Sequence, residues 1–248
     1  MGRRLIGAAV ALAIVVSAAP AAAAPARLPG IDVSRFQEDI YWPAVAGEGI
    51  RFAFVQASRG SGADCSVVAR QCGADGHYDF NYEQAKAAGI RVGPYHRAFV
   101  GGDGPRSVKA DARAEALVFA TEVGNLRGTD LRPALDLETP FSDLSPTELR
   151  TWARTWLDST ERRLGVKPSI YTNASSWKAL GDPTSFAHRG HALWVANWDV
   201  AAPQVPAANW AGRSWRIWQH SSDGDLNGIA GRVDLDWLRG GWRGLGLG

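Results

Sequence analysis

The sequence predicts an α/β barrel in which five strand–helix units are followed by three strands joined by loops. Eight short apolar, β-branched or aromatic runs recur along the chain, and helical patterns separate the earlier ones. Alternation of this kind is typical of parallel strands connected by helices, and eight such strands can close into a barrel. After the sixth run the helical patterns stop, because residues 199–213 contain two prolines and residues 221–232 are rich in Gly and Asp. We therefore expect no helix in either segment.

The expected elements follow from these patterns in chain order. The strands are Pro29–Ser34, Arg51–Ser58, Arg91–Phe99, Arg132–Glu138, Ser169–Thr172, Ala192–Trp198, Ser214–His220 and Val233–Trp237. The helices are Tyr41–Glu48, Tyr82–Ala88, Asp111–Val123, Pro146–Leu164 and Ser175–Leu180. The fourth helix has the clearest ends, because Ser145 and Glu148 match a capping box and Gly165 stands where a helix-ending glycine is common.

The first 24 residues have the pattern of a secretory signal peptide. Arg3 and Arg4 precede an apolar run from Leu5 to Ala19, and a small-residue run then ends at Ala24. The apolar run is shorter than the roughly 20 residues that a membrane span needs, so we favour cleavage over anchoring and expect no stable membrane association. The export route, general or twin-arginine, stays open. Residues 25–248 are then expected to form a single barrel domain that is secreted as a monomer.

Composition limits the partners and indicates the compartment. Removing Arg3 and Arg4 from the 27 basic residues leaves 25, equal to the 25 acidic ones, so the exported domain is close to neutral. A nucleic-acid-binding protein would carry a basic excess, and we therefore expect no nucleic-acid partner. The two cysteines are Cys65 and Cys72. In an exported chain their short spacing favours a local disulfide over free thiols, and two ligands alone make a poor zinc site.

Acidic residues lie on three of the expected strands, near the ends where a parallel barrel has its active site. Asp32 lies on the first strand, Asp136 and Glu138 on the fourth, and Asp234 on the last. Residues two apart on a strand point to the same face, so the carboxylates of Asp136 and Glu138 project together. Their like charges are expected to raise the pKa of one carboxyl, as a general acid requires.

A structural ion pair, with Arg97 or Arg132 as the cation, is the alternative interpretation of the acidic pair on the fourth strand. The spacing of that pair alone does not favour catalysis over it. The acids on the first and last strands change the balance, because these strands are neighbours in a closed barrel and four carboxylates then surround one mouth. Burying four acids together is costly unless a function requires it.

Aromatic and amide side chains near the same strand ends predict a carbohydrate-binding groove. Indole and phenol rings combine a flat apolar face with a polar edge, which suits stacking on sugar rings. The alternative is burial in the core, which we expect for Trp152 and Trp156 on the fourth helix. The candidate substrate-binding residues are Tyr95, Tyr171, Trp198, Gln56, Asn197 and Gln219.

No metal and no other cofactor is expected. His96 and His220 are the histidines at expected strand ends, and the chain has no His-x-His or His-Glu-x-x-His spacing. We expect His96 to position or pack other groups. A nucleophilic serine is disfavoured because no Gly-x-Ser-x-Gly segment occurs.

From Gly30 to about Leu238 the chain resembles the glycoside hydrolase family 25 lysozymes. The segments that carry the resemblance lie in order on the expected strands and are Gly30–Ser34, Phe54–Ser58, Gly93–His96, Asp136–Glu138, Ile170–Thr172, Leu193–Ala196, Trp218–Gln219 and Val233–Asp234. The resemblance implies a flattened TIM-like (β/α)5(β)3 barrel. It also implies an N-acetylmuramidase, which hydrolyses the β-1,4 bond between N-acetylmuramic acid and N-acetylglucosamine in the glycan strands of bacterial peptidoglycan.

By position, the resemblance implies a role for each acid at the mouth. Glu138 corresponds to the general acid and Asp136 to its partner. Asp32 and Asp234 correspond to flanking carboxylates that orient water or substrate. Residues 25–248 are on this interpretation a single catalytic domain that acts outside the cell or in the cell wall.

The chain departs from the family pattern at several positions. Gln56 stands where the family often has lysine, Arg97 where an aromatic residue is usual, and Asp236 where asparagine is common. An insertion from Gly62 to Gly76 also lengthens the loop after the second strand. None of these departures removes an acid, although they are expected to alter substrate preference.

We hypothesise substrate-assisted hydrolysis with net retention, in which the 2-acetamido group attacks the anomeric carbon and Asp136 stabilises the oxazolinium ion. Two residues along a strand span about 6.5–7 Å, longer than the roughly 5–5.5 Å between a retaining pair with a direct carboxylate nucleophile. One alternative is a catalytically silent protein that binds cell-wall glycan, which the presence of every expected acid disfavours. A second is a chitinase-like glycan hydrolase.

Overall fold

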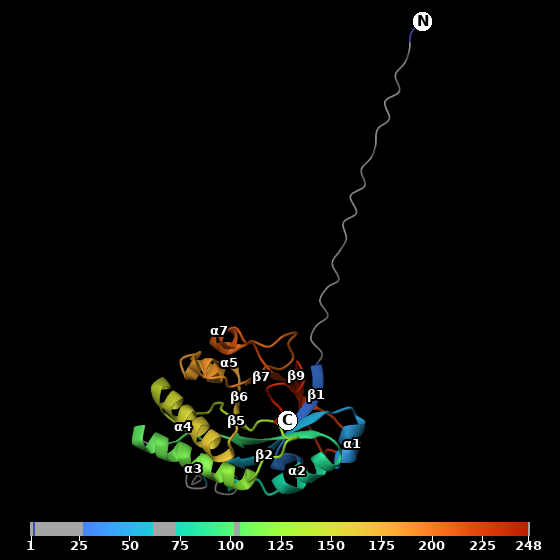
Figure 1. The fold of residues 1–248 in the computed structure, drawn as a ribbon, viewed down its shortest axis with the longest axis horizontal. Coiled ribbons are helices and arrows are strands. Elements are labelled where there is room, and N and C mark those ends of the chain that lie inside the picture. Colours follow the sequence, from blue (N-terminus) through green and yellow to red (C-terminus); the bar gives the residue numbers. More distant parts are fainter. Residues whose placement is uncertain (1, 3–26, 62–72, 102–104, 248) are drawn as a thin grey trace.

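Eight strands of the computed structural model form a closed barrel, within the described residues 2, 27–61, 73–101 and 105–247 (Figure 1). They are β1 (Arg27–Val33), β2 (Phe52–Arg59), β4 (Arg91–Arg97), β5 (Ala134–Asp136), β6 (Ser169–Thr172), β7 (Leu193–Ala196), β8 (Ile217–Gly224) and β9 (Val233–Arg239). They pair in the order β1-β9-β8-β7-β6-β5-β4-β2, and the β1–β2 pairing closes the ring. A two-residue strand, β3 (Gly73–Ala74), pairs with β2 outside the ring.

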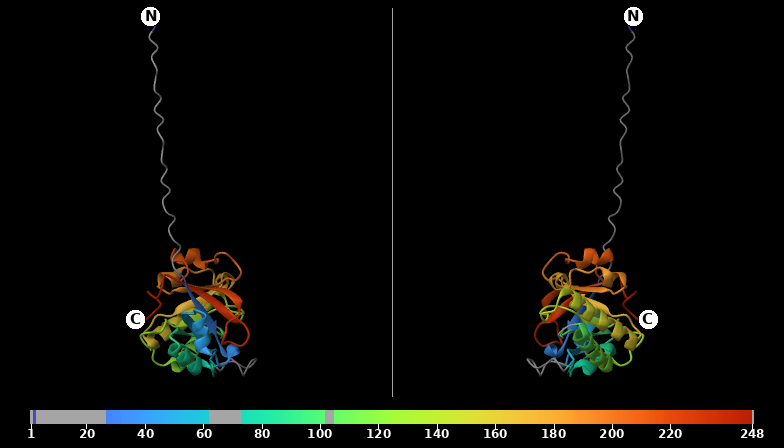
Figure 2. Two further views of the ribbon diagram at one scale, coloured as in Figure 1. Left: turned by 90° about the vertical axis from the view of Figure 1, so that its right-hand side faces the viewer. Right: turned by 90° about the vertical axis from the view of Figure 1, so that its left-hand side faces the viewer.

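The sheet is mixed, because β9 runs antiparallel to both of its neighbours, β8 and β1. All other pairings in the ring are parallel. The segment 225–232 between β8 and β9 is too short for a crossover, which takes a dozen or more residues, so the two strands form a hairpin. The side views show β1 in blue beside the red C-terminal strands (Figure 2). The start of β9 therefore lies at the barrel end where the parallel strands finish.

Helices cover the outside of the barrel, and α3 and α4 lie side by side (Figure 1). The α-helices are α1 (Trp42–Gly47), α2 (Tyr78–Ala87), α3 (Pro105–Val123), α4 (Pro146–Leu164), α5 (Ala174–Ala179), α6 (Ser185–His188) and α7 (Pro206–Ala211). The bounds of α4 are those the sequence predicts. Ser145 and Glu148 form the expected reciprocal capping box, and Gly165 ends the helix with φ at 69°.

Other helical expectations are corrected. Both α2 and α3 begin earlier than predicted, and a 3-10 turn, η1 (Arg35–Gln37), together with α6 adds to the expected set. The expectation of no helix in residues 199–213 is wrong, because α7 lies there. Residues 207–211 have φ between 50° and 56°, so α7 is a left-handed turn, which carries no ordinary α-helical period.

Two apolar layers position the site. The first fills the barrel and includes Phe54, Tyr171 and Trp194. The second lies between strands and helices and includes Leu135, Leu137 and the expected core residues Trp152 and Trp156. The fourth expected strand thus alternates as predicted, with its leucines turned toward the helices and its acids left to face the barrel interior.

Two expectations fall outside the described residues. The predicted signal peptide does so apart from Gly2, and the predicted disulfide between Cys65 and Cys72 does so entirely. Both stay predictions. In the described part of the chain, no helix combines the length and apolar character needed to cross a membrane.

Close packing inside the barrel leaves no room for a side chain at Gly30. A Cβ built there would lie 2.2 Å from Cε1 of Phe52, whereas a Cβ at Gly47, in α1, meets no atom within 4 Å. We expect Gly30→Ala to lower the free energy of unfolding by about 1–3 kcal/mol, because overpacking forces the buried ring or the strand to move. Urea denaturation measures the change. The control Gly47→Ala should lose nothing, and equal stability of the two variants would contradict this account.

Candidate active site

A cavity of about 190 Å³ opens where the parallel strands end. It brings together all four predicted catalytic acids and four of the six predicted substrate-binding residues. These are Asp32, Asp136, Glu138, Asp234, Gln56, Tyr95, Tyr171 and Gln219. The remaining lining residues are Ser34, Phe36, Arg59, Arg97 and Trp194.

The pairing of β1 with β9 places two of the acids together. Asp32 near the end of β1 is the register partner of Asp234 near the start of β9. The sequence predicted that these acids share one side of the mouth, but it treated Asp234 as lying near the finish of a parallel strand. The antiparallel direction of β9 brings Asp234 to the mouth instead.

Asp32, Asp234 and Asp236 form an acidic cluster, because Asp32 is the register partner of Asp234 and the charges of both β9 acids raise the pKa of Asp32, after burial as the larger cause. Burial is the main cause that raises the pKa of Asp234 to about 6 and that of Asp236 to about 8, and it holds the pKa of Asp32 well above its usual range. Trp194 Nε1 also donates to Asp236 Oδ1 at 2.8 Å.

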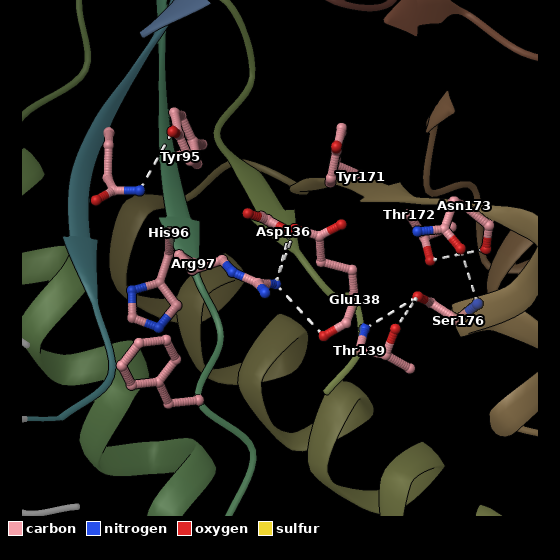
Figure 3. A network of polar contacts seen from close by, with 12 residues as sticks. Tyr95, His96, Arg97, Asp136, Glu138, Thr139, Tyr171, Thr172, Asn173 and Ser176 are labelled. Carbon is pink, nitrogen blue, oxygen red and sulfur yellow. Dashed lines mark hydrogen bonds and ion pairs between the residues drawn. The ribbon is translucent and has the colours of Figure 1, made fainter. Parts of the chain in front are cut away.

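Arg97 lies between the two acids of the fourth predicted strand (Figure 3). Its Nη1 is 3.2 Å from Asp136 Oδ1 and 3.3 Å from Glu138 Oε1, and it also donates to the Glu138 carbonyl at 3.4 Å. Of the two cations in the structural alternative, Arg97 therefore makes the ion pair. The pair is part of the mouth, so the two interpretations of these acids describe one site.

Burial controls the protonation of this pair. Desolvation raises the pKa of Asp136 to about 7, while Arg97 opposes the rise and the charge of Glu138 adds to it. Desolvation also raises the pKa of Glu138, again against Arg97. The sequence predicted a raised pKa from like charges, so the direction is right and the main cause is different.

The chain just after Glu138 is held by α5. The Thr139 N–H donates to Ser176 Oγ at 3.0 Å, and the two hydroxyl oxygens are 3.3 Å apart (Figure 3). Asn173 caps the same helix by accepting from the Ser176 N–H at 2.9 Å. The helix end thus supports the residue that follows the acid.

A hydrogen-bond network connects the acids to the predicted substrate-binding residues. Gln219 Nε2 donates to Asp32 Oδ2 at 2.8 Å, and the amide oxygen of Gln219 accepts from both Tyr171 Oη and Trp198 Nε1 at 2.9 Å. Burial raises the pKa of the Tyr171 hydroxyl well above its usual range, so this group stays a donor. The network therefore fixes side chains on both sides of the mouth.

Gln56 and Tyr95 form a smaller pair on the opposite wall. Gln56 Nε2 donates to Tyr95 Oη at 3.2 Å. The buried Gln56 amide oxygen has no hydrogen-bond partner among the residues that the structure describes. This oxygen can accept from a ligand that enters the cavity.

A second cavity of about 300 Å³ adjoins the first and contains the other two predicted substrate-binding residues, Asn197 and Trp198. Glu138 lines both cavities. Trp198 is 47% exposed, so its ring is available for stacking, unlike the buried Trp194. Glu138 consequently lies at the junction of two spaces that can each hold part of a linear ligand.

His96 lies outside this site, as a packing residue. Its Nδ1 is 2.8 Å from Ser58 Oγ and its Nε2 is 2.7 Å from Glu115 Oε2, and the ring stacks on Trp156. Burial lowers the pKa of His96 to about 3, so the ring is neutral, with the serine donating to Nδ1 and Nε2–H donating to the carboxylate. These bonds connect β4 to α3.

Two arginines at the mouth were not among the predicted site residues, since Arg97 was named only as the cation of the alternative ion pair and as a departure from the family pattern, and Arg59 was not named. Arg97 stands two residues after Tyr95, and strand alternation could have placed both in the cavity. Arg59 stands three residues after Gln56, a spacing that predicts opposite faces. A bulge between Gln56 and Ser58 shifts the register and returns Arg59 to the mouth.

The comparisons with known proteins identify the family of this barrel. The model of the glycosyl hydrolases family 25 matches residues 31–229. The chain belongs to glycosyl hydrolase family 25. It is 31% identical over 218 residues to Lysozyme M1 of Streptomyces globisporus, covering 85% of this chain and 67% of that protein. The N,O-diacetylmuramidase of a Chalaropsis species is 27% identical, over 83% of this chain and 95% of the relative.

A solved structure agrees with this assignment. The bacterial lysozyme from Streptomyces coelicolor superposes with a TM-score of 0.72 at 30% identity, covering 86% of this chain and 92% of that chain. The family and these relatives establish the chain as a family 25 lysozyme, a glycoside hydrolase that acts on peptidoglycan. The resemblance noted in the sequence is confirmed.

Removing the cation between the two acids should move the pH dependence of this family 25 lysozyme. A positive charge favours the ionised carboxylate, so Arg97→Gln should raise the pKa of both Asp136 and Glu138. Both limbs of the pH profile of kcat/KM on soluble peptidoglycan fragments should then shift upward by about one unit. Arg97→Lys, which keeps the charge, should shift them less. Unmoved limbs in the glutamine variant would show that Arg97 does not control these protons.

Asp236 should lower stability at alkaline pH, because its pKa in the folded state is raised. A raised folded pKa contributes stability at acid pH that is lost as the pH rises through about 8. The amide in Asp236→Asn can still accept from Trp194 Nε1 and does not ionise. We expect this variant to raise the free energy of unfolding by about 1–3 kcal/mol at pH 8 and to change it little at pH 4. Urea denaturation at the two pH values tests it, and a loss at pH 8 would refute it.

Proposed function

We propose that this family 25 lysozyme cleaves the β-1,4 bond between N-acetylmuramic acid and N-acetylglucosamine, with Glu138 and Asp136 as its catalytic residues. The observation that carries the proposal is the position of Glu138, which lines both cavities and lies beside Asp136 through the shared contact with Arg97. A glycan strand that occupies both cavities passes its scissile bond over this carboxyl. Relatives named lysozyme and N,O-diacetylmuramidase support the choice of glycan.

Glu138 acts as the general acid. Burial raises the pKa of its carboxyl, which favours the protonated form that can donate to the glycosidic oxygen. The same group, once ionised, can take a proton from the water that completes hydrolysis. Its place at the junction of the cavities allows contact with both the leaving sugar and the incoming water.

Asp136 assists the 2-acetamido group of the substrate. In this mechanism the acetamido oxygen attacks the anomeric carbon while the bond to the leaving oxygen breaks, and water later opens the oxazolinium ion. Ionised Asp136 accepts from the acetamido N–H and balances the positive charge that develops. Arg97 favours that ionised form, since its charge opposes the rise in pKa that burial causes. Two displacements at one carbon give net retention.

Asp32 and Asp234 orient groups on the other wall. Gln219 fixes Asp32 from the side, and the β1–β9 register holds Asp234 beside it. Tyr95, Tyr171, Gln56 and Gln219 are assigned to the sugar in the first cavity. Asn197 and Trp198 are assigned to the sugar in the second.

Several expectations about the mature protein belong to the same proposal. We infer removal of residues 1–24 on export, a secreted monomeric domain from residue 25, and a disulfide between Cys65 and Cys72 under oxidising conditions. We also assign the barrel to the (β/α)5(β)3 type. The positions of α1 to α5, each in a connection between consecutive barrel strands, support that layout.

The mutation Glu138→Gln tests the catalytic assignment. We expect kcat to fall by about 10³-fold or more while binding to insoluble peptidoglycan is kept, because the amide preserves shape and loses the acid. Mass spectrometry of borohydride-reduced fragments should show muramitol ends that vanish in the variant. Glu83→Gln, at a surface ion pair with Arg127, is the matched control and should keep full activity. Glucosaminitol ends, or release by Glu138→Gln, would contradict the proposal.

Stereochemistry tests the substrate-assisted step separately. The first product anomer, followed by proton NMR before mutarotation, should be the β form, because retention preserves the configuration of the bond. Chitin should be a poor substrate. An α anomer formed first would exclude retention, and chitin cleaved as fast as peptidoglycan would favour the chitinase-like alternative.

A further inference from the structure

Six arginines gather at the barrel end opposite the catalytic mouth. Some stand at or next to the amino ends of parallel strands, and one stands at the end of antiparallel β9. The others lie in the segments that adjoin these strand ends. The six are Arg27, Arg132, Arg213, Arg216, Arg239 and Arg243, and they are called here the arginine end. All six are exposed or half-buried. The acids of the mouth lie at the other ends of the same strands.

The backbone places these arginines next to one another. Arg27 on β1 is the register partner of Arg239 on β9, and the Arg239 N–H donates to the Arg216 carbonyl at 2.9 Å. Arg216 Nη2 in turn donates to the carbonyl of Arg243 at 2.7 Å, and Arg239 Nη2 to that of Arg213 at 3.5 Å. Barrel geometry therefore holds like charges together.

No carboxylate compensates these charges within the described residues, where none of the six arginines has an ion pair with Asp or Glu. Arg27 and Arg239 lie instead over the ring of Trp215, at 5.6 and 4.7 Å from its centroid. The charge of Arg239 lowers the pKa of Arg216, and that of Arg27 lowers the pKa of Arg239, in each case after burial as the larger cause. Mutual repulsion without a counterion is unfavourable, and an anionic ligand would relieve it.

The arginine end also contains a cavity of about 270 Å³. Arg132, Arg213, Arg216 and Arg243 line it from separate segments of the chain, together with Ser214. A tetrahedral phosphate has oxygens on all sides and can accept from guanidinium groups that converge from several directions. A planar carboxylate offers two oxygens in one plane, which a single arginine fork can satisfy.

We propose that the arginine end binds a polymer of regularly spaced phosphodiesters, of the kind attached to bacterial cell walls. One phosphate occupies the cavity, and the following phosphates contact Arg27 and Arg239 on the adjoining surface. This binding site is separate from the catalytic groove, so it does not depend on the mechanism proposed for that groove. The composition of residues 25–248 does not indicate this binding site, because basic and acidic residues are equal in number and differ only in where they lie.

The test compares two triple variants of the full chain that lose the same charge. Arg132→Gln, Arg213→Gln and Arg243→Gln remove three arginines whose side chains make no hydrogen bond or ion pair within the described part of the chain, so folding should be kept. Lys109→Gln, Arg113→Gln and Arg154→Gln are the control, since these residues line another basic groove of about 330 Å³ on the helices. Titration calorimetry with poly(glycerol phosphate) measures affinity at 50–200 mM salt.

The arginine-end variant should bind at least about tenfold more weakly, with the slope of log affinity against log salt reduced by about 2. The control should change less than about threefold, and both variants should hydrolyse phosphate-free peptidoglycan fragments at the parent rate. An equal loss in both variants would overturn the proposal by assigning binding to net charge. So would equal or tighter binding of polyglutamate, phosphatidylglycerol vesicles or duplex DNA. If the triple variant unfolds, the single variants Arg213→Gln and Arg243→Gln can each be compared with the single control variant Arg113→Gln.

Discussion

The rest of the site depends on how the ring of strands closes at β1. This strand pairs with parallel β2 on one side and with antiparallel β9 on the other, which sets Asp32 opposite Asp234. Closure also removes these acids from water, and burial then raises the pKa of both carboxyls. The register fixes the position of Asp32, and Gln219 hydrogen-bonds with Asp32, Tyr171 and Trp198. The register therefore also influences where the side chains that face the substrate lie.

The sequence predicted the parts of the fold that local signals determine. The capping box and the closing glycine of α4, and the alternation that turns Leu137 away from the mouth, depend on neighbours a few residues apart. The direction of β9 was missed because the expected strands leave a connection of 12 residues, 221–232, which a crossover can use. In the structure β8 continues to Gly224, and the eight residues that remain permit only a hairpin. The left-handed turn α7 could not be predicted, because its five residues with positive φ include no glycine and follow no ordinary helical period, and its Trp210 contacts the distant Trp177.

The sequence predicted most of the residues that line the site, but not the main cause of their pKa shifts. Spacing alone places the acids and Tyr95 at the strand ends. Strand alternation also places Arg97 on the same face as Tyr95. It fails at Arg59, where a bulge changes the face. The main cause of the raised pKa of Asp136 is desolvation, which arises when distant segments cover the carboxyl and cannot be read from the spacing of two acids.

The two ends of the barrel carry opposite charges, and the separation has a mechanistic consequence. A polyanion near the mouth would raise the pKa of Asp136 and Glu138 further and deprive the first of its ionised form. β1 spans seven residues from Arg27 to Val33, about 20 Å of extended chain. Distance therefore weakens the field of a phosphate polymer at the catalytic pair when the polymer is held at the arginine end. Attachment to an anionic wall and acid–base chemistry on its uncharged glycosidic bonds can then proceed together.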